Sequence, residues 1–91
     1  MKATDEKFFN KNSELSIEFS KYVIEHSEIE PLLSEDKVII FLPEYDRELR
    51  DFNIRMGRDI EKEGGKVLYV KVKDLSPKIS SRLVGVEVTA Q

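Results

Sequence analysis

The sequence predicts an α/β fold, a small two-layer domain in which a helix precedes a β-α-β unit of parallel strands and a C-terminal edge strand follows. Two observations carry this prediction. The longest unbroken apolar run, residues 38–42, is rich in β-branched and aromatic side chains and too short for a core helix, which favours a strand buried on both faces. A second strand pattern, at residues 66–73, follows a stretch with helical periodicity, and β-α-β is the simplest unit that connects the two.

Length and composition narrow the class of protein. A chain of 91 residues permits one domain, residues 1–91, and a chain this short buries only about 60–65% of its unfolded surface. Cysteine is absent, which excludes disulfides and thiolate chemistry and makes the cytoplasm the expected location. No segment approaches the roughly 20 apolar residues of a membrane span, and acids near the N-terminus do not suit a signal peptide, so we expect the mature chain to start at Met1. Charged residues make up 36% of the chain and glutamine occurs once, a thermophile-like composition.

Charge is distributed unevenly along the chain. Residues 1–46 contain five lysines and eleven acids, residues 47–65 contain five of each sign, and residues 66–91 contain five basic residues against two acids. The net charge of −3 gives no general argument for nucleic acid. The basic C-terminal part is a local argument for it.

Residues 5–26 show the periodicity of an amphipathic helix. Its predicted core face consists of apolar residues at helical spacing: Phe8, Leu15, Phe19, Tyr22 and Val23. Asn12 falls among these positions, and we expect backbone groups to satisfy its amide. Ile17 and Ile24, one heptad apart, project from nearly the opposite side, where a monomer should be polar.

A connector follows this helix. His26, near the helix end, has no recognisable catalytic partner nearby, so capping or packing is the favoured role. Residues 27–36 contain Pro31 and are expected to form a short helical turn held under the core by three apolar residues, Ile29, Leu32 and Leu33.

A second helix should follow Pro43, which ends the first strand because it has no N–H to donate. Glu44 or Asp46 can cap the start of the helix, and the pair Gly64–Gly65 can end it. Its predicted core face is Tyr45, Leu49, Phe52, Met56 and Ile60. The far side holds Ile54 among arginines, with Gly57 as a notch for another backbone: Arg47, Arg50 and Arg58.

The remaining chain predicts two further strands. Residues 66–73 alternate, and a helical connection from the first strand predicts parallel pairing with a right-handed crossover. Residues 74–81 are expected to form a loop. Residues 82–88 alternate in Val84, Val86 and Val88, which predicts the third, edge strand.

Catalytic and cofactor signatures are weak. The loop after the first strand, where open α/β sheets place ligands, lacks the glycines of a phosphate site and carries competing acids. Glu44 and Asp46, with Glu48, are candidate Mg²⁺ ligands for a metal-dependent hydrolase, but helix capping is the favoured role of these acids. The serines lack a nucleophile elbow. We therefore predict no cofactor, no metal and no catalytic residue.

The basic segment 66–82 has the ingredients of a platform for single-stranded RNA. Tyr69 supplies an aromatic ring for stacking, and the cations for phosphate are Lys71, Lys73, Lys78 and Arg82. Lysines on an exposed strand also protect it from edge pairing, and this second role is favoured because the segment has one aromatic residue and no glycine-aromatic RNA motif.

Three segments, FNKNSELSIEFSKYVIEHSEI, VIIFLPEYDRELRDFN and VLYVKVKDLSPKISSRLV, together resemble a family of short uncharacterised archaeal and bacterial proteins. The resemblance covers roughly residues 8–88. It implies a stand-alone prokaryotic protein, and it implies no activity, cofactor or site residue.

The leading functional prediction is a non-enzymatic homodimer with an interaction or regulatory role, with a second protein as a further candidate partner. The expected interface residues lie on the outward helix faces: Ile17, Ile24, Arg50, Ile54 and Arg58. An RNA-binding module is the first alternative and a metal-dependent hydrolase the weaker one. No membrane association is expected.

Overall fold

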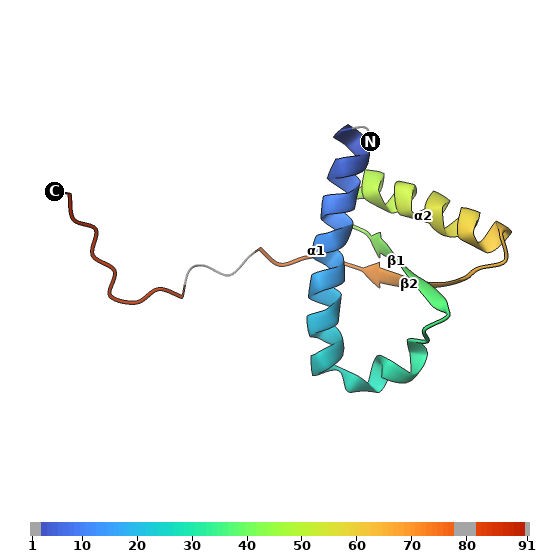
Figure 1. The fold of residues 1–91 in the computed structure, drawn as a ribbon, viewed down its shortest axis with the longest axis horizontal. Coiled ribbons are helices and arrows are strands. Elements are labelled where there is room, and N and C mark those ends of the chain that lie inside the picture. The colour runs from blue at the N-terminus through green and yellow to red at the C-terminus, as the bar shows by residue number, and fades with distance from the viewer. Residues whose placement is uncertain (1–2, 78–81, 91) are drawn as a thin grey trace.

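The computed structural model describes residues 3–77 and 82–90. Its elements, in chain order, are helix α1 (Ala3–Glu25), the 3₁₀ helix η1 (Ser27–Leu32), strand β1 (Lys37–Pro43), helix α2 (Arg47–Lys62) and strand β2 (Lys66–Val72) (Figure 1). This order confirms the predicted α/β class, with a helix and a short helical turn ahead of a β-α-β unit. None of the helices in the described ranges is long and apolar enough to cross a membrane.

The sheet pairs β1 and β2 in parallel, as predicted. Its register runs from Lys37 opposite Lys66 to Pro43 opposite Val72. The Glu44 N–H extends the ladder by donating to the Val72 carbonyl at 2.8 Å. Because a helix of 16 residues fills the connection, the two strands meet only when α2 folds between them.

The sheet lies between the two helices near the carboxyl ends of its strands. Val70 and Val72 pack against the core on the α1 side, whereas the Tyr69 ring meets α2 at Gly57. Successive side chains of a strand point to opposite faces, so α1 and α2 cover different faces. The alternating apolar residues of β2 thus give each face of the sheet contact with one helix.

The core is small and lies where α1 crosses the strand ends. Phe8, Leu15, Phe41 and Leu49 form its buried cluster. Two ring contacts extend this cluster: Phe8 to Phe52, with centroids 4.6 Å apart, and Phe19 to Phe41, edge to face at 5.6 Å. Helix α1 is therefore held by aromatic contacts to both α2 and β1.

Tyr22 was expected in this core, and that expectation is wrong. Its side chain is 49% exposed, and its ring stacks on His26 with centroids 3.9 Å apart. The core ends near Phe19 because the last turns of α1 extend beyond the strands (Figure 1).

Helix α2 has the predicted ends and a rotated buried face. Asp46 caps it, with Oδ1 accepting from the Leu49 N–H at 3.2 Å, and Gly64 ends it with φ of 88°. Its fully buried positions are Leu49, Asn53 and Gly57, spaced by four.

Two members of the predicted core face of α2 are exposed instead. Tyr45 is 42% exposed and Met56 is 37% exposed. Asn53 and Gly57 face inward instead. The Asn53 side-chain amide donates a hydrogen bond to β1, and Gly57, which has no side chain, leaves room for the ring of Tyr69. The notch at Gly57 is therefore filled from within the chain.

The predicted edge strand at residues 82–88 is wrong. Residues 82–90 form no strand, and the sheet of the described chain has two strands. Gly85 has φ of 64°, in the left-handed region, which interrupts an extended run. The segment extends away from the helices and strands (Figure 1).

Candidate functional site

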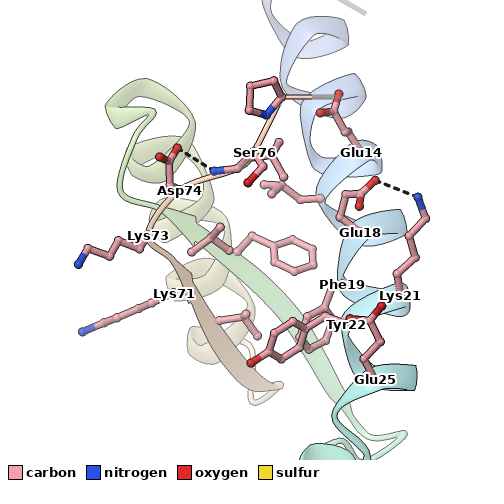
Figure 2. Close-up of a pocket in the computed structure, with 16 residues that line it drawn as sticks. Glu14, Glu18, Phe19, Lys21, Tyr22, Glu25, Lys71, Lys73, Asp74 and Ser76 are labelled. Carbon is pink, nitrogen blue, oxygen red and sulfur yellow. Dashed lines mark hydrogen bonds and ion pairs between the residues drawn. The ribbon is translucent and has the colours of Figure 1, made fainter. Parts of the chain in front are cut away.

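A hollow lies between the second half of α1 and β2, and we call it the α1–β2 groove (Figure 2). Its volume is about 770 Å³. Its apolar side chains come from α1, β1 and β2: Leu15, Phe19, Tyr22, Phe41, Val70 and Val72. The groove exists because the apolar face of α1 is longer than the two-stranded sheet is wide. The last apolar residues of that face therefore have no third strand opposite them.

Charges of both signs surround this apolar floor. Glu14, Glu18 and Glu25 stand on the α1 side, whereas Lys71 and Lys73 lie on the other side of the groove and direct their side chains away from α1 (Figure 2). The Glu18 carboxylate accepts from Lys21 Nζ at 3.2 Å. A rim of this kind suits an amphipathic ligand with an apolar centre and charged ends.

The chain itself closes one end of the groove. Residues 73–77 run along it after β2, and Asp74 Oδ1 accepts from the Leu75 N–H at 2.8 Å. Leu75 is half-buried there. At the other end the His26 ring stacks on Tyr22, and His26 Nδ1 lies 3.0 Å from the Tyr22 carbonyl oxygen, which agrees with a packing role.

The two edges of the sheet differ in how they are covered. The Glu44 N–H points from β1 to β2. Main-chain groups alternate sides along a strand, so the main-chain groups of Phe41 and Pro43 point to the free edge of β1. There Asn53 Nδ2 donates to the Phe41 carbonyl at 2.9 Å, and Pro43 has no N–H. By the same alternation Tyr69 and Lys71 direct their main-chain groups to the edge of β2 that borders the groove, where no strand of the described residues pairs.

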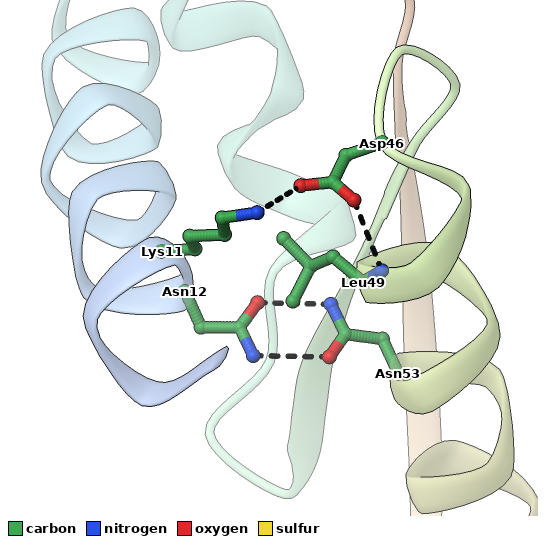
Figure 3. A network of polar contacts seen from close by, with 5 residues as sticks. All are labelled: Lys11, Asn12, Asp46, Leu49 and Asn53. Carbon is green, nitrogen blue, oxygen red and sulfur yellow. Dashed lines mark hydrogen bonds and ion pairs between the residues drawn. The ribbon is translucent and has the colours of Figure 1, made fainter. Parts of the chain in front are cut away.

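A polar network joins the two helices beside β1 (Figure 3). Asn12 and Asn53 exchange two hydrogen bonds, with Nδ2 to Oδ1 distances of 3.0 and 2.8 Å. Asn53 is 1% exposed, and with its third bond to Phe41 both of its polar atoms are satisfied. The expectation that backbone would satisfy Asn12 is therefore wrong, because a side chain 41 residues away does so.

The candidate metal ligands do not act together. Asp46 accepts from Lys11 Nζ at 2.6 Å, and this hydrogen bond lowers the pKa of its carboxyl group (Figure 3). Glu44 is exposed at the turn before α2. Among the described residues no group of three or more acids and histidines could hold a metal ion. The hydrolase alternative stays a prediction that metal titration would test.

The candidate RNA contacts are only partly brought together. Lys71 and Lys73 are exposed on the groove rim, Arg82 is exposed in the C-terminal segment, and Lys78 lies outside the described residues. The Tyr69 hydroxyl donates to Glu61 at 2.6 Å, which raises the tyrosine pKa, and its ring lies against Gly57. The ring proposed for base stacking is thus used in packing α2.

The candidate interface residues lie on two helices. Ile17 and Ile24 are exposed on α1, as predicted. On α2, Ile54 and Arg50 are half-buried and Arg58 is exposed. Among these candidate interface residues, the exposed apolar side chains therefore lie on α1.

Comparison with known proteins gives a family and no activity. Residues 7–86 match the profile of a family of unknown function, DUF5647. The chain belongs to this family. No curated protein and no solved structure is significantly similar to it. The DUF5647 match includes both helices, both strands and most of the C-terminal segment, which confirms the resemblance to an uncharacterised family.

Sequence reasoning missed the α1–β2 groove and the Asn12–Asn53 pair. Both depend on where α1 crosses the sheet, a contact that local periodicity does not specify. One signal was available for the asparagine: Asn53 follows Leu49 by four residues, on the same face of α2 as the most buried residue of that helix.

Proposed function

We propose that this member of DUF5647 is a non-enzymatic, homodimeric interaction protein of the cytoplasm, with a regulatory or accessory role. The observation that carries the proposal is the outward face of α1. Phe9, Ile17 and Ile24 are 63%, 59% and 81% exposed on it.

These three side chains form one surface. At about 100° per residue they fall within a wedge of about 80° on the helix. The positions between them on this face are serines, so the face carries no charge between Phe9 and Ile24: Ser13, Ser16 and Ser20. Single exposed apolar residues are ordinary, but an uncharged stretch of helix face with three large apolar residues is typical of a helix that packs against another chain.

The small core gives association a thermodynamic benefit. Five hydrophobic side chains of the described residues are buried, namely Phe8, Leu15, Ile40, Phe41 and Leu49. Covering the α1 face removes further apolar area from water, at about 25 cal/mol per Å². Dimer formation would therefore stabilise the fold by a free energy that rises with the logarithm of protein concentration.

RNA binding and metal-dependent hydrolysis receive less support. The RNA platform needs a free aromatic ring, and Tyr69 packs on α2 instead. The hydrolase needs a free carboxylate at Asp46, which Lys11 and the α2 N-terminus occupy. The lysine pair Lys71 and Lys73 is what remains in favour of RNA.

Light scattering on a size-exclusion column tests the proposal. We expect the wild-type chain to elute as a dimer and the Ile17→Glu/Ile24→Glu variant as a monomer with an unchanged circular dichroism spectrum. The matched control is Asn10→Glu/Ser27→Glu, which adds the same charge at exposed positions beside the face and should remain dimeric. A wild-type chain that stays monomeric at millimolar concentration would contradict the proposal.

A further inference from the structure

We infer that residues 82–88 of one chain add as a strand to the open edge of β2 in a second copy, where they lie in the α1–β2 groove. This inference rests on the proposed self-association and adds to the α1 face a second contact, which this segment and this edge make. Main-chain hydrogen bonds would supply the affinity and alternate side chains the fit, as in other cases of strand addition.

The sheet directs an added strand to β2. At the free edge of β1 the Phe41 carbonyl is taken by Asn53, and Pro43 offers no donor. At the edge of β2 the main-chain groups of Tyr69 and Lys71 face the groove. An unpaired edge beside an apolar hollow is a template for a further strand.

The C-terminal segment has the side-chain pattern that this edge requires. Val84, Val86 and Val88 alternate and are 93%, 61% and 93% exposed, and Leu83 is 74% exposed. Seven extended residues span about 23 Å at ~3.3 Å per residue, which equals the span of the seven residues of β2. Gly85 adopts extended and left-handed backbone with similar ease, so its present φ does not prevent pairing.

The groove complements this segment in polarity. Valines on one side of the added strand would meet Phe19 and Val70 of the floor. Acids of α1 lie beside the groove for Arg82. Glu87 alternates to the opposite side of the strand from the valines, and it would lie on the face of the sheet to which Lys71 points (Figure 2). The segment has an apolar centre, one basic residue and one acidic residue, and the site offers an apolar floor with a charge of opposite sign for each of them.

A second copy is the occupant that the path of the chain favours. Residues 73–77 of the same chain already line one end of the groove, and residues 82–90 then lead away from it (Figure 1). The valines are thereby presented to another molecule. The DUF5647 match extends to Val86, so most of this segment is part of the family's chain.

Cysteine crosslinking distinguishes exchange between chains from closure within one chain, and the absence of native cysteine makes it clean. A Tyr22→Cys chain would be mixed with a mass-tagged Val86→Cys chain and treated with a short bis-maleimide. We expect a tagged-untagged heterodimer as the main product. The matched control replaces Tyr22→Cys by Asp59→Cys, on the exposed side of α2, and should give at least tenfold less heterodimer. A Tyr22→Cys/Val86→Cys chain that crosslinks internally and stays monomeric would overturn the inference.

Variants of the segment separate this inference from the proposed function. Val84→Lys/Val86→Lys should weaken dimerisation at least tenfold in light scattering, and a chain ending at Pro77 should do the same without relying on folding of a substituted strand. Thr89→Lys/Ala90→Lys adds the same charge beyond the strand and should have no effect. If the wild-type chain is dimeric and the shortened chain is equally dimeric, the inference fails while self-association stands. If the wild-type chain is monomeric, both fail.

Discussion

Asn53 shows how one buried amide joins three elements. Its side chain bonds Asn12 of α1 and the Phe41 carbonyl of β1 while α2 carries it, and it is 1% exposed. Removing such a group leaves its partners unsatisfied, and each unsatisfied partner costs about 1–3 kcal/mol.

We therefore expect Asn53→Ala to lower the free energy of unfolding by about 2–4 kcal/mol, and Asn12→Ala to lower it by less, since Asn53 then keeps its bond to Phe41. Asn53→Asp, which keeps the shape but turns an acceptor toward the Phe41 carbonyl, should cost at least as much as Asn53→Ala. Urea denaturation measures all three. Equal stability of the wild-type and Asn53→Ala chains would show that the network contributes nothing.

Asp36 makes stability depend on pH. Hydrogen bonds from Ser34 and Lys66, together with the charge of that lysine, lower its pKa from 3.8 to about 2. A lowered folded-state pKa means that the ionised form favours the fold, so this contribution is complete above about pH 4 and is lost as the pH falls toward 2.

We expect the free energy of unfolding to decrease between pH 4 and pH 2, and Asp36→Asn to flatten that decrease. Lys11 adds to the same slope through Asp46, whose pKa is lowered as well. Glu35→Gln removes a neighbouring exposed carboxylate and serves as the control. A wild-type profile that Asp36→Asn leaves unaltered would rule out this residue as a source of the slope.

At the scale of elements, the contact of α2 with β2 depends on a glycine. A Cβ on Gly57 would lie 2.7 Å from the Tyr69 hydroxyl oxygen and 2.9 Å from its ring. Real Cβ contacts are not that short, so Tyr69 would have to move and release Glu61.

Gly57→Ala is accordingly expected to cost about 1–3 kcal/mol from overpacking, in excess of the ~1 kcal/mol that alanine contributes to a helix. In a Tyr69→Val background the clash is absent, and the same substitution should stabilise by up to about 1 kcal/mol. Thermal denaturation of the four chains in this cycle measures the sign change. Destabilisation by Gly57→Ala in both backgrounds would assign the cost to the backbone and not to Tyr69.

How well each element could be predicted follows from where its signals lie. Helix α2 was correctly bounded because Asp46 and Gly64 act within one turn of its ends. The parallel pairing also followed, because a helical connection leaves little choice. The prediction of a strand at residues 82–88 was wrong. Alternation shows that a segment can pair with a sheet edge, but it does not show whether that edge belongs to the same chain.

The candidate site was less predictable than the fold. Ile17 and Ile24 could be placed outward from α1 periodicity alone, and the structure agrees. The α1–β2 groove combines residues that are about 50 positions apart in the sequence, such as Phe19 and Val70, and no local pattern brings them together. Tyr69 was misjudged as a free ring for the same reason, since Gly57 receives it from another element.

At the scale of the whole molecule, self-association should make stability depend on concentration. For a dimer that is more stable than its monomer, each tenfold rise in protein concentration adds about 1.4 kcal/mol per dimer to the free energy of unfolding at 25 °C. The melting temperature of the wild-type chain should therefore rise with concentration between micromolar and millimolar. The Ile17→Glu/Ile24→Glu chain should show a constant melting temperature, and a constant one in the wild type would indicate a monomer.

The open edge of β2 also determines what kind of assembly can grow. Each chain carries one C-terminal segment and one such edge, so the two are present in equal number. If two chains each add their C-terminal segment to the other, the assembly is a closed dimer with twofold symmetry in which both segments are paired. If each chain donates to the next, the same contact continues head to tail as a filament. The length of chain between β2 and Arg82 sets how far the C-terminal segment can extend from its own sheet. This distance decides between a closed dimer and an open polymer.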